Sequence, residues 1–482
     1  MKKFWLVLLS LGLVMAFSAS AFAVDVKFSG DYYAAGIYLD KSTVMGNNQG
    51  HYVYDHINGY VFVPTGEANS SAFYFQRLRV GTDFVVSPCL KLVTRFDAME
   101  RIWGGARDDG QYYGYYRDPQ SAGTRFENEN IAFDLLYIDY TSPIGLFRVG
   151  YQPDNVWGTV FGDRGKGPTA GQITYAAPIG PVIISAQYAK EGDNSLSAVN
   201  YNTYSGVTDR DYDSYRVGVT YNFNTAQAKG EVGTLFHYDR DAENRDGLPI
   251  DNPLYPYYGA GYLSNVYKVI PYFKAKVGPV DIQGEFEYTF GDAIKAEAPA
   301  SNPDMDIDAW SVFLDATANF GQFYVGGSFV YLTGDDPNSN DTVEGGSLIN
   351  PAGLDWNPCL MMFNTETFGY WVGGVSGHDN TVIGEEMSNV IFGQLRVGVR
   401  PIPQLDINLA IAYATADEKP AGFDNSDYGT EIDLTGTYKI TNNLSYMLGA
   451  GYLFTGDYYK GSNGNNEVDN DFIVLNKLTL SF

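Results

Sequence analysis

Arginine and carboxylate side chains recur at every second position in several short segments of this sequence. In one such segment, Arg77, Arg79 and Asp83 alternate with apolar residues. Alternation with a period of two is typical of a β-strand with one polar face and one apolar face. Arg is well suited to hold carboxylates, because its planar guanidinium offers two parallel hydrogen bonds. The pattern therefore predicts a charged face of a sheet that could bind or select charged solutes.

The same polar parity recurs along the chain and supplies both signs of charge. The predicted inward-facing set is Arg77, Arg79, Arg95, Asp97, Arg101, Arg148, Lys274, Lys276, Asp281, Glu285, Glu287, Arg396, Arg400, Asp406, Glu431 and Asp433. Arg opposite carboxylates would set a transverse field across a pore and form a selective constriction. The alternative is that these groups neutralise one another across strands and only keep the wall hydrated.

Patterns typical of catalysis or cofactor binding are sparse. The four histidines are His51, His56, His237 and His378. The spacing of His51 and His56 matches no standard metal or catalytic signature. The sequence also contains no Cys-x-x-Cys motif and no haem-attachment motif. We therefore expect no enzyme, no metal site and no cofactor, although a hydrolase at a barrel rim remains an alternative.

Alternating segments extend from Val24 to the end of the chain, and we count about 18 of them. Short turns rich in Pro, Gly or Asn are predicted at residues 87–89, 142–145, 178–181, 222–226, 278–279, 320–322, 401–403 and 441–443. Longer polar connections are predicted at residues 40–71, 104–127, 153–169, 191–211, 239–262, 291–306, 335–387, 416–427 and 456–470. This alternation predicts an all-β, transmembrane, antiparallel up-and-down β-barrel with short periplasmic turns and long extracellular loops. The registers of segments 128–142 and 263–278 stay open.

The amino terminus has the pattern of an export signal. A basic start and the apolar run Phe4–Phe17 precede the small residues Ala21 and Ala23. We predict a signal peptide over residues 1–23, cleaved after Ala23, and a single barrel domain over residues 24–482. An uncleaved anchor is the alternative. No later apolar stretch approaches the length of a membrane-spanning helix, so the sequence favours the bacterial outer membrane over the periplasm or the medium.

The segment Asp471–Phe482 alternates apolar and mostly polar residues up to an aromatic end. It resembles the closing strand of bacterial outer-membrane β-barrels, in which a terminal Phe is the usual last residue. The resemblance implies that Phe482 belongs to a signal for the outer-membrane assembly machinery. We expect this strand to pair with Val24–Leu39, with Lys477 facing the pore and Leu478 facing lipid, since an open strand edge is not tolerated in a membrane.

The connection over residues 334–387 differs from the others. It carries nine acidic residues, no Lys or Arg, and an apolar cluster that includes Trp356, Trp371 and Met361–Phe363. Because loops of this length are usually functional, we expect part of it to fold into the pore or over its mouth. The alternative is a solvated surface loop. Its acids are of the type through which divalent cations would bridge it to lipopolysaccharide, but their spacing fits no defined calcium loop.

The composition limits the classes of partner. The formal net charge of −26 disfavours nucleic acid, because phosphate binding needs clustered Lys and Arg. The 39 Tyr and 54 Gly residues suit amphipathic strands, turns and interfacial aromatic belts rather than a helical protein. Cys89 and Cys359 fall on opposite sides of the predicted membrane, so we expect no disulfide between them.

Two further stretches carry a family resemblance. YLTGDDP at Tyr331–Pro337, followed by LDWNPCL at Leu354–Leu360, resembles a feature of the alginate-export family of outer-membrane proteins and its porin-like relatives. FQRLRVGTDF at Phe75–Phe84 resembles the early Arg-rich strand of that family. The resemblance implies an 18-stranded barrel with an Arg-lined conduit for an anionic polysaccharide.

These observations lead to one main expectation about function. The sequence predicts a porin-like outer-membrane channel for passive diffusion of small hydrophilic or charged solutes, in contact with outer-membrane lipid and lipopolysaccharide. An exporter of an anionic, alginate-like polysaccharide is the first alternative. A structural barrel around a partner, such as an electron-transfer cytochrome, is the second, because a barrel of this width could admit one.

Overall fold

The structure is a computed structural model that describes residues 24–46, 50–55, 59–64, 70–104, 131–154, 156–165, 169–194, 209–245, 261–296, 304–347 and 349–482. The predicted signal peptide lies outside these residues. None of the helices in the described ranges has the length and apolar character needed to cross a membrane.

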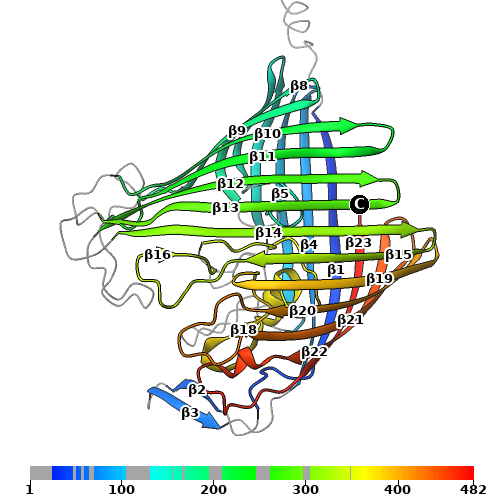
Figure 1. Cartoon of the computed structure of the whole chain (residues 1–482). Helices are drawn as coiled ribbons and strands as arrows, with labels where there is room; N and C mark the ends of the chain where they lie inside the picture. Colours follow the sequence, from blue (N-terminus) through cyan, green and yellow to red (C-terminus); the bar gives the residue numbers. More distant parts are fainter. Residues whose placement is uncertain are drawn as a thin grey trace, which may run out of the picture.

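Strands make up most of the described chain (Figure 1). They are β1 (Asp25–Leu39), β2 (Gly50–Asp55), β3 (Gly59–Pro64), β4 (Ser71–Ser87), β5 (Leu90–Ile102), β6 (Ile131–Ser142), β7 (Gly145–Pro153), β8 (Thr169–Ile179), β9 (Val182–Gly192), β10 (Tyr212–Asn224), β11 (Ala228–Asp241), β12 (Tyr262–Val277), β13 (Val280–Ala296), β14 (Met305–Phe320), β15 (Phe323–Leu332), β16 (Thr342–Val343), β17 (Val375–Ser376), β18 (Val382–Ile383), β19 (Val390–Ile402), β20 (Leu405–Thr415), β21 (Asp427–Lys439), β22 (Leu444–Thr455) and β23 (Asp471–Ser481). The helical segments are η1 (Thr365–Gly369), α2 (Tyr370–Val372), η2 (His378–Asn380) and η3 (Asp457–Lys460).

Eighteen of these strands form a closed antiparallel barrel. Each strand pairs with the next along the chain, and β23 pairs with β1 to close the ring, from Asp31 opposite Ser481 to Leu39 opposite Ile473. The fold class, the strand number and the closing pair predicted from the sequence are confirmed, and every predicted short turn joins two neighbouring strands. The short strand β16 adds in parallel to the edge of β14.

The outer face of the barrel is apolar. Large hydrophobic side chains are highly exposed on strands in different parts of the barrel, as for Phe133 on β6 at 68% and Leu395 on β19 at 73%. On the closing strand, Leu478 and Leu480 are exposed, whereas the Lys477 Nζ lies 4.4 Å from the ring centroid of the buried Tyr33. The predicted alternation on this strand is therefore confirmed. An apolar outer belt is the surface that a lipid bilayer requires of a barrel.

The inner face is apolar as well in the half of the barrel next to the long connections, where the sequence pattern predicts a polar lumen. The buried wall residues there are Tyr33, Ile37, Leu39, Phe75, Phe313, Leu332, Phe392 and Leu475. They pack against residues of the β15–β19 connection, among them Met361, Met362, Phe368, Trp371, Val375, Ile383 and Met387. The apolar cluster of this connection therefore lies inside the barrel, where a yellow helical segment is visible (Figure 1).

A β-bulge in β5 alters one predicted orientation. Met99 has a φ of 53°, and the register with β4 shifts so that Arg101 lies opposite Gln76 and Ile102 opposite Phe75. Directly opposite residues share a face of the sheet, and Phe75 belongs to the inner core. Arg101 is therefore on the outer face, and its predicted place in the pore lining is wrong. A bulge inserts one residue and reverses the parity beyond it, which simple alternation does not anticipate.

The open register of segment 128–142 has the same cause. The pairing of β5 with β6 shifts between Arg95 and Phe96, which changes the parity that faces inward along part of β6. In segment 263–278 the pairing of β12 with β13 shifts only between Leu263 and Asn265, and the register is constant from Asn265 to Val277.

The contact between the inner wall and the long connection can be tested at Phe75, whose ring stacks on Trp371 with centroids 4.5 Å apart. We expect Phe75→Ala to weaken the docking of the connection by about 3–5 kcal/mol, the usual cost of truncating a buried Phe. Limited proteolysis of the folded barrel should then cleave within residues 334–389 much faster than in the wild type.

Tyr74→Ala is the matched control, because Tyr74 is the next residue on β4 and points outward, where it stacks on Trp103. Equal protease resistance of the Phe75→Ala variant and the wild type would contradict the packing described here.

Candidate functional site in the barrel interior

The β15–β19 connection is held inside the barrel by two carboxylates of β21. The Glu431 carboxylate accepts hydrogen bonds from the backbone N–H groups of Leu360 at 3.0 Å, Met361 at 2.8 Å and Met362 at 2.7 Å. Asp433 accepts a further bond from the Leu360 N–H at 3.1 Å. Three successive N–H groups around one carboxylate form a strong, directional anchor. Glu431 is completely buried, so its role is to position the connection and not to meet solute.

A short helix inside the connection is oriented by this anchor. The Asn364 side chain accepts hydrogen bonds from the N–H groups of Thr367 and Phe368 and so caps η1. The helix continues through α2 and carries Trp371, whose Nε1–H donates to the Tyr33 hydroxyl on β1 at 3.1 Å. The helix therefore crosses from β21 towards β1 and β4.

A second connection, between β7 and β8, also folds inward. Its Thr159 donates from both N–H and hydroxyl to Glu285 on β13, at 2.6 and 2.9 Å. Its Phe161 stacks on Phe313 of β14 with centroids 5.0 Å apart, and the Phe161 carbonyl accepts from the Gly353 N–H at 2.9 Å. The two inward connections therefore contact each other and narrow the lumen together.

The wall formed by β4 and β5 carries a basic ladder with paired acids. Arg79 binds Asp97 through two hydrogen bonds of 2.7 Å each. Arg95 binds Asp134 at 2.7 Å. Arg77 is held more loosely, with a nitrogen 3.5 Å from Glu100. Its guanidinium carbon also lies 5.2 Å from the ring centroid of Tyr33, which favours a cation–π contact.

A cavity of about 240 Å³ separates this ladder from the long connection. Its lining residues are Arg77, Arg79, Asp97 and Glu100 on the wall, and Leu354, Asp355, Thr365, Glu366 and Tyr370 on the connection. Burial raises the pKa of the Tyr370 phenol to about 12, and the nearby Glu100 carboxylate acts in the same direction. The hydroxyl therefore stays neutral in a cavity with basic groups on one side and acidic groups on both.

The remaining predicted residues form separate groups around the wall. Their ion pairs are Arg148 with Asp139 at 3.0 Å, Lys274 with Glu231 at 2.8 Å, Lys276 with Asp281 at 2.8 Å, Lys268 with Glu287 at 2.7 Å, Arg396 with Asp315 at 2.6 Å and Arg400 with Asp406 at 2.7 Å. The structure thus brings Arg77, Arg79, Arg95 and Asp97 together but spreads the other predicted residues over several strands. Glu285, Glu431 and Asp433 hold the inward connections.

Sequence reasoning missed a buried polar cluster on β9, β10 and β11. Arg216 binds Asp154 of the β7–β8 connection at 2.6 Å and Glu191 at 3.4 Å. His237 contacts Ser214 at 2.7 Å and Asp239 at 2.9 Å. The alternation of residues along β10 indicates that Arg216 faces inward. Its partner Asp154 lies in the β7–β8 connection, and no local sequence pattern predicts that this connection folds into the barrel. His237, one of the four histidines of the chain, is a buried member of this cluster.

The two cysteines are both free. Cys89 is exposed in the β4–β5 turn, and Cys359 is buried in the β15–β19 connection. Burial raises the pKa of the Cys359 thiol well above its usual value, with the Glu431 carboxylate adding to the effect. The thiol is therefore neutral and acts as a packing group.

Comparisons with known proteins find likeness in structure only. No protein-family model matches the chain, and no curated protein matches it in sequence. The structure of Pseudomonas aeruginosa OpdK with vanillate is 10% identical, with a TM-score of 0.46, and the match covers 95% of this chain and 99% of that chain. Pseudomonas aeruginosa OccK9 (OpdG) is 12% identical, with a TM-score of 0.48 and coverage of 96% and 100%.

The anion-selective porin from Comamonas acidovorans is 11% identical, with a TM-score of 0.41 and coverage of 95% of this chain and 99% of that chain. At these identities and scores, the likeness assigns neither a family nor a solute to this chain. The predicted relation to the alginate-export family is not shown.

The anchor at Glu431 yields a direct test. Glu431→Ala leaves the buried N–H groups of Met361 and Met362 without an acceptor, whereas that of Leu360 keeps Asp433, and each lost acceptor costs about 1–3 kcal/mol. We expect the connection to be released, so that its protease cleavage rises at least about tenfold. Thr437→Ala is the control, because Thr437 lies on the same strand at the far end of the lumen. If both variants resist protease as the wild type does, the anchor does not hold the connection.

Proposed function

We propose that this protein is a porin-like channel of the bacterial outer membrane for passive diffusion of small hydrophilic or charged solutes. One observation carries the proposal: an apolar-surfaced closed barrel has its interior reduced by inward connections to a charged cavity at β4 and β5. A barrel of this strand number is too wide for its own side chains to fill. Connections that fold into the lumen would narrow it and make permeation selective.

The cavity beside the basic ladder is the proposed constriction. Arg77 and Arg79 face Asp355 and Glu366 across it, so a solute would pass between opposite charges. Such an arrangement orients dipolar solutes and discriminates among ions by charge. Arg77 is the residue best placed to act on a solute. The Arg79 guanidinium already donates two hydrogen bonds to the Asp97 carboxylate, whereas Arg77 is only 3.5 Å from Glu100. The remaining inward ion pairs would line the wider parts of the path.

Outer-membrane localisation and its partners follow from the same proposal. The apolar belt would contact lipid, and the long connections would lie on the lipopolysaccharide side. Export by the signal peptide over residues 1–23 and recognition of Phe482 by the assembly machinery belong to this proposal as well. Phe482 itself is tied into the barrel, since its N–H and carbonyl both bond to Gly30, at 3.0 and 2.9 Å.

A conduit for an anionic polysaccharide, which the alginate-export resemblance implies, has less support in the geometry. Arg79 and Arg95 are already bound by carboxylates, and Asp355 and Glu366 line the same cavity. The passage would therefore offer a polyanion little net positive charge, and the folded connections would obstruct a chain-like solute. The same obstruction counts against a barrel that sheaths a partner protein.

The channel proposal is tested by planar-bilayer conductance of the purified full-length protein. We expect discrete ohmic steps. Arg77→Gln should shift the reversal potential in a salt gradient towards cation preference, by about threefold in permeability ratio. One unit charge about 7 Å from an ion in water contributes about 0.6 kcal/mol. Absence of steps from correctly folded, heat-modifiable protein would refute the channel.

Arg148→Gln serves as the control for position, because Arg148 lies near a short turn and pairs with Asp139 away from the cavity. A shift of equal size in this variant would mean that the ladder is not the selective element.

The filter role of the long connection has its own test. Deleting residues 340–385 removes the connection from the lumen while every barrel strand is retained. We expect the product to stay heat-modifiable on a gel and to show a clearly larger single-channel conductance. A collapsed, protease-sensitive product would instead assign the connection a structural role.

A further inference from the structure

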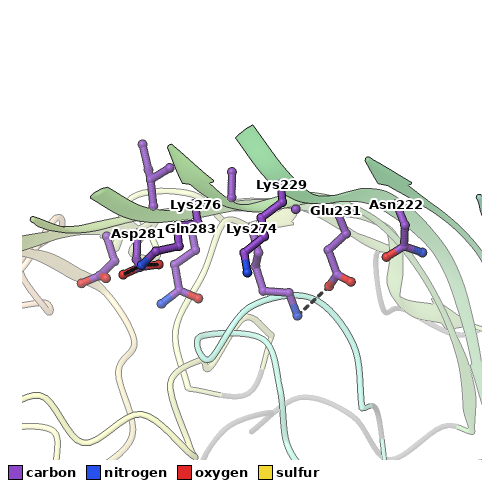
Figure 2. A pocket seen from close by; sticks show the side chains of 11 residues that line it. Asn222, Lys229, Glu231, Lys274, Lys276, Asp281 and Gln283 are labelled. Atoms are coloured by element: carbon purple, nitrogen blue, oxygen red, sulfur yellow. Dashed lines mark hydrogen bonds and ion pairs between the residues drawn. The ribbon is translucent and has the colours of Figure 1, made fainter. Parts of the chain in front are cut away.

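A second hollow lies at the other end of the lumen, next to the short turns. Its volume is about 590 Å³, and it is formed by the inner face of β10 to β14 (Figure 2). The polar residues that line it are Asn222, Lys229, Glu231, Lys274, Lys276, Asp281, Gln283 and Asp315. The hollow is on different strands from the proposed constriction, and the two share no lining residue.

Three lysines line this hollow, but only two of its three acidic residues pair with them. Lys274 pairs with Glu231 at 2.8 Å, and Lys276 pairs with Asp281 at 2.8 Å. The third acid, Asp315, is bound by Arg396 at 2.6 Å. Within the described part of the chain, Lys229 has no ion-pair or hydrogen-bond partner. One positive charge in the hollow is therefore uncompensated by the protein.

The strand register brings two like charges face to face. Lys229 on β11 lies directly opposite Lys276 on β12. Figure 2 shows both side chains, with Lys274, projecting from the same side of the sheet. Like charges directly opposite each other destabilise a sheet. The Asp281 carboxylate offsets the charge of Lys276 through hydrogen bonds of 2.8 and 2.9 Å, whereas the charge of Lys229 is left for an anion in the hollow. Both side chains are exposed, which leaves them accessible to a solute.

The neutral residues of the hollow suit an oxyanion. Asn222 and Gln283 line it with side-chain amides. The Gln283 amide has two N–H donors, and the Asn222 amide has one besides the N–H that it donates to the Pro181 carbonyl at 3.5 Å. Lysine is a compact, mobile charge with three donors and commonly binds phosphate. The hollow thus combines an excess positive charge with neutral donors in a chain whose net charge is −26.

We propose that Lys229 and Lys276, with Asn222 and Gln283, bind a small inorganic or organic oxyanion of the phosphate class at the short-turn end of the lumen. The oxyanion site is independent of the proposed constriction, but it would make the two ends of the proposed channel differ in their affinity for anions. Anions would collect at the short-turn end, whereas the acidic β15–β19 connection lies towards the other end. Conduction would then depend on the side to which a multivalent anion is added.

Binding can be measured on the detergent-solubilised full-length barrel with inorganic phosphate as the probe, by phosphorus NMR line broadening at low ionic strength. We expect saturable binding in the wild type that Lys229→Gln weakens about tenfold, the effect of losing one hydrogen bond to a charged group. Lys439→Gln is the matched control. Lys439 also lines the lumen at a short turn, but in a separate hollow on β21.

Two results would overturn the site. One is equal phosphate binding by the wild type and Lys229→Gln. The other is equal weakening by Lys229→Gln and Lys439→Gln, which would mean that only the general charge of the lumen matters. Heat-modifiability on a gel identifies the folded variants, so that a folding defect is not mistaken for lost binding.

A conductance readout separates this inference from the channel proposal. If the protein conducts, phosphate added to the short-turn side should reduce the current more than phosphate on the opposite side, and Lys229→Gln should abolish that difference. Symmetric block would contradict the site. If the protein does not conduct at all, the channel proposal fails, while the binding measurement still decides whether the oxyanion site exists.

Discussion

The structure depends on one constraint: every strand must have a hydrogen-bonded neighbour on both sides. A bilayer offers no water to unpaired backbone groups, so a sheet can cross it only as a closed ring. The pairing of β1 with β23 meets this requirement. Closure fixes the alternation of inward and outward residues on the strands, and it creates an interior that the strands alone cannot fill. The remaining features of the protein are responses to that interior.

The β7–β8 and β15–β19 connections fold back into the barrel from one rim and fill part of its interior. Where the β15–β19 connection enters, the wall is apolar, and the connection packs against it as a core would. The polar contacts are few and specific, chiefly Glu431 with three backbone N–H groups and Thr159 with Glu285. Apolar burial supplies most of the stabilisation, and these buried carboxylates set the position of the connections. Charged wall residues remain accessible beside the connections, in the cavity at β4 and β5, and beyond them near the short turns.

Charge is therefore distributed unevenly along the lumen. The long connection contributes its acids towards one end, and the lysines of β11 and β12 lie at the other. Most inward charges are held in ion pairs, which shapes a local field more than it adds net charge. The few groups with weak partners or none, such as Arg77 and Lys229, are those on which a passing solute can act.

The sequence alone determined the barrel, the strand number, the short turns and the outward face, because these follow from local alternation and turn chemistry. It also marked most of the inward charges. Only the tertiary structure decided which of them meet. The bulge at Met99 turned Arg101 outward, and the path of two connections made Glu285 and Glu431 into anchors. A strand's alternation is a property of its own residues, whereas the occupant of the lumen is set by contacts between segments far apart in the chain. No local pattern records those contacts.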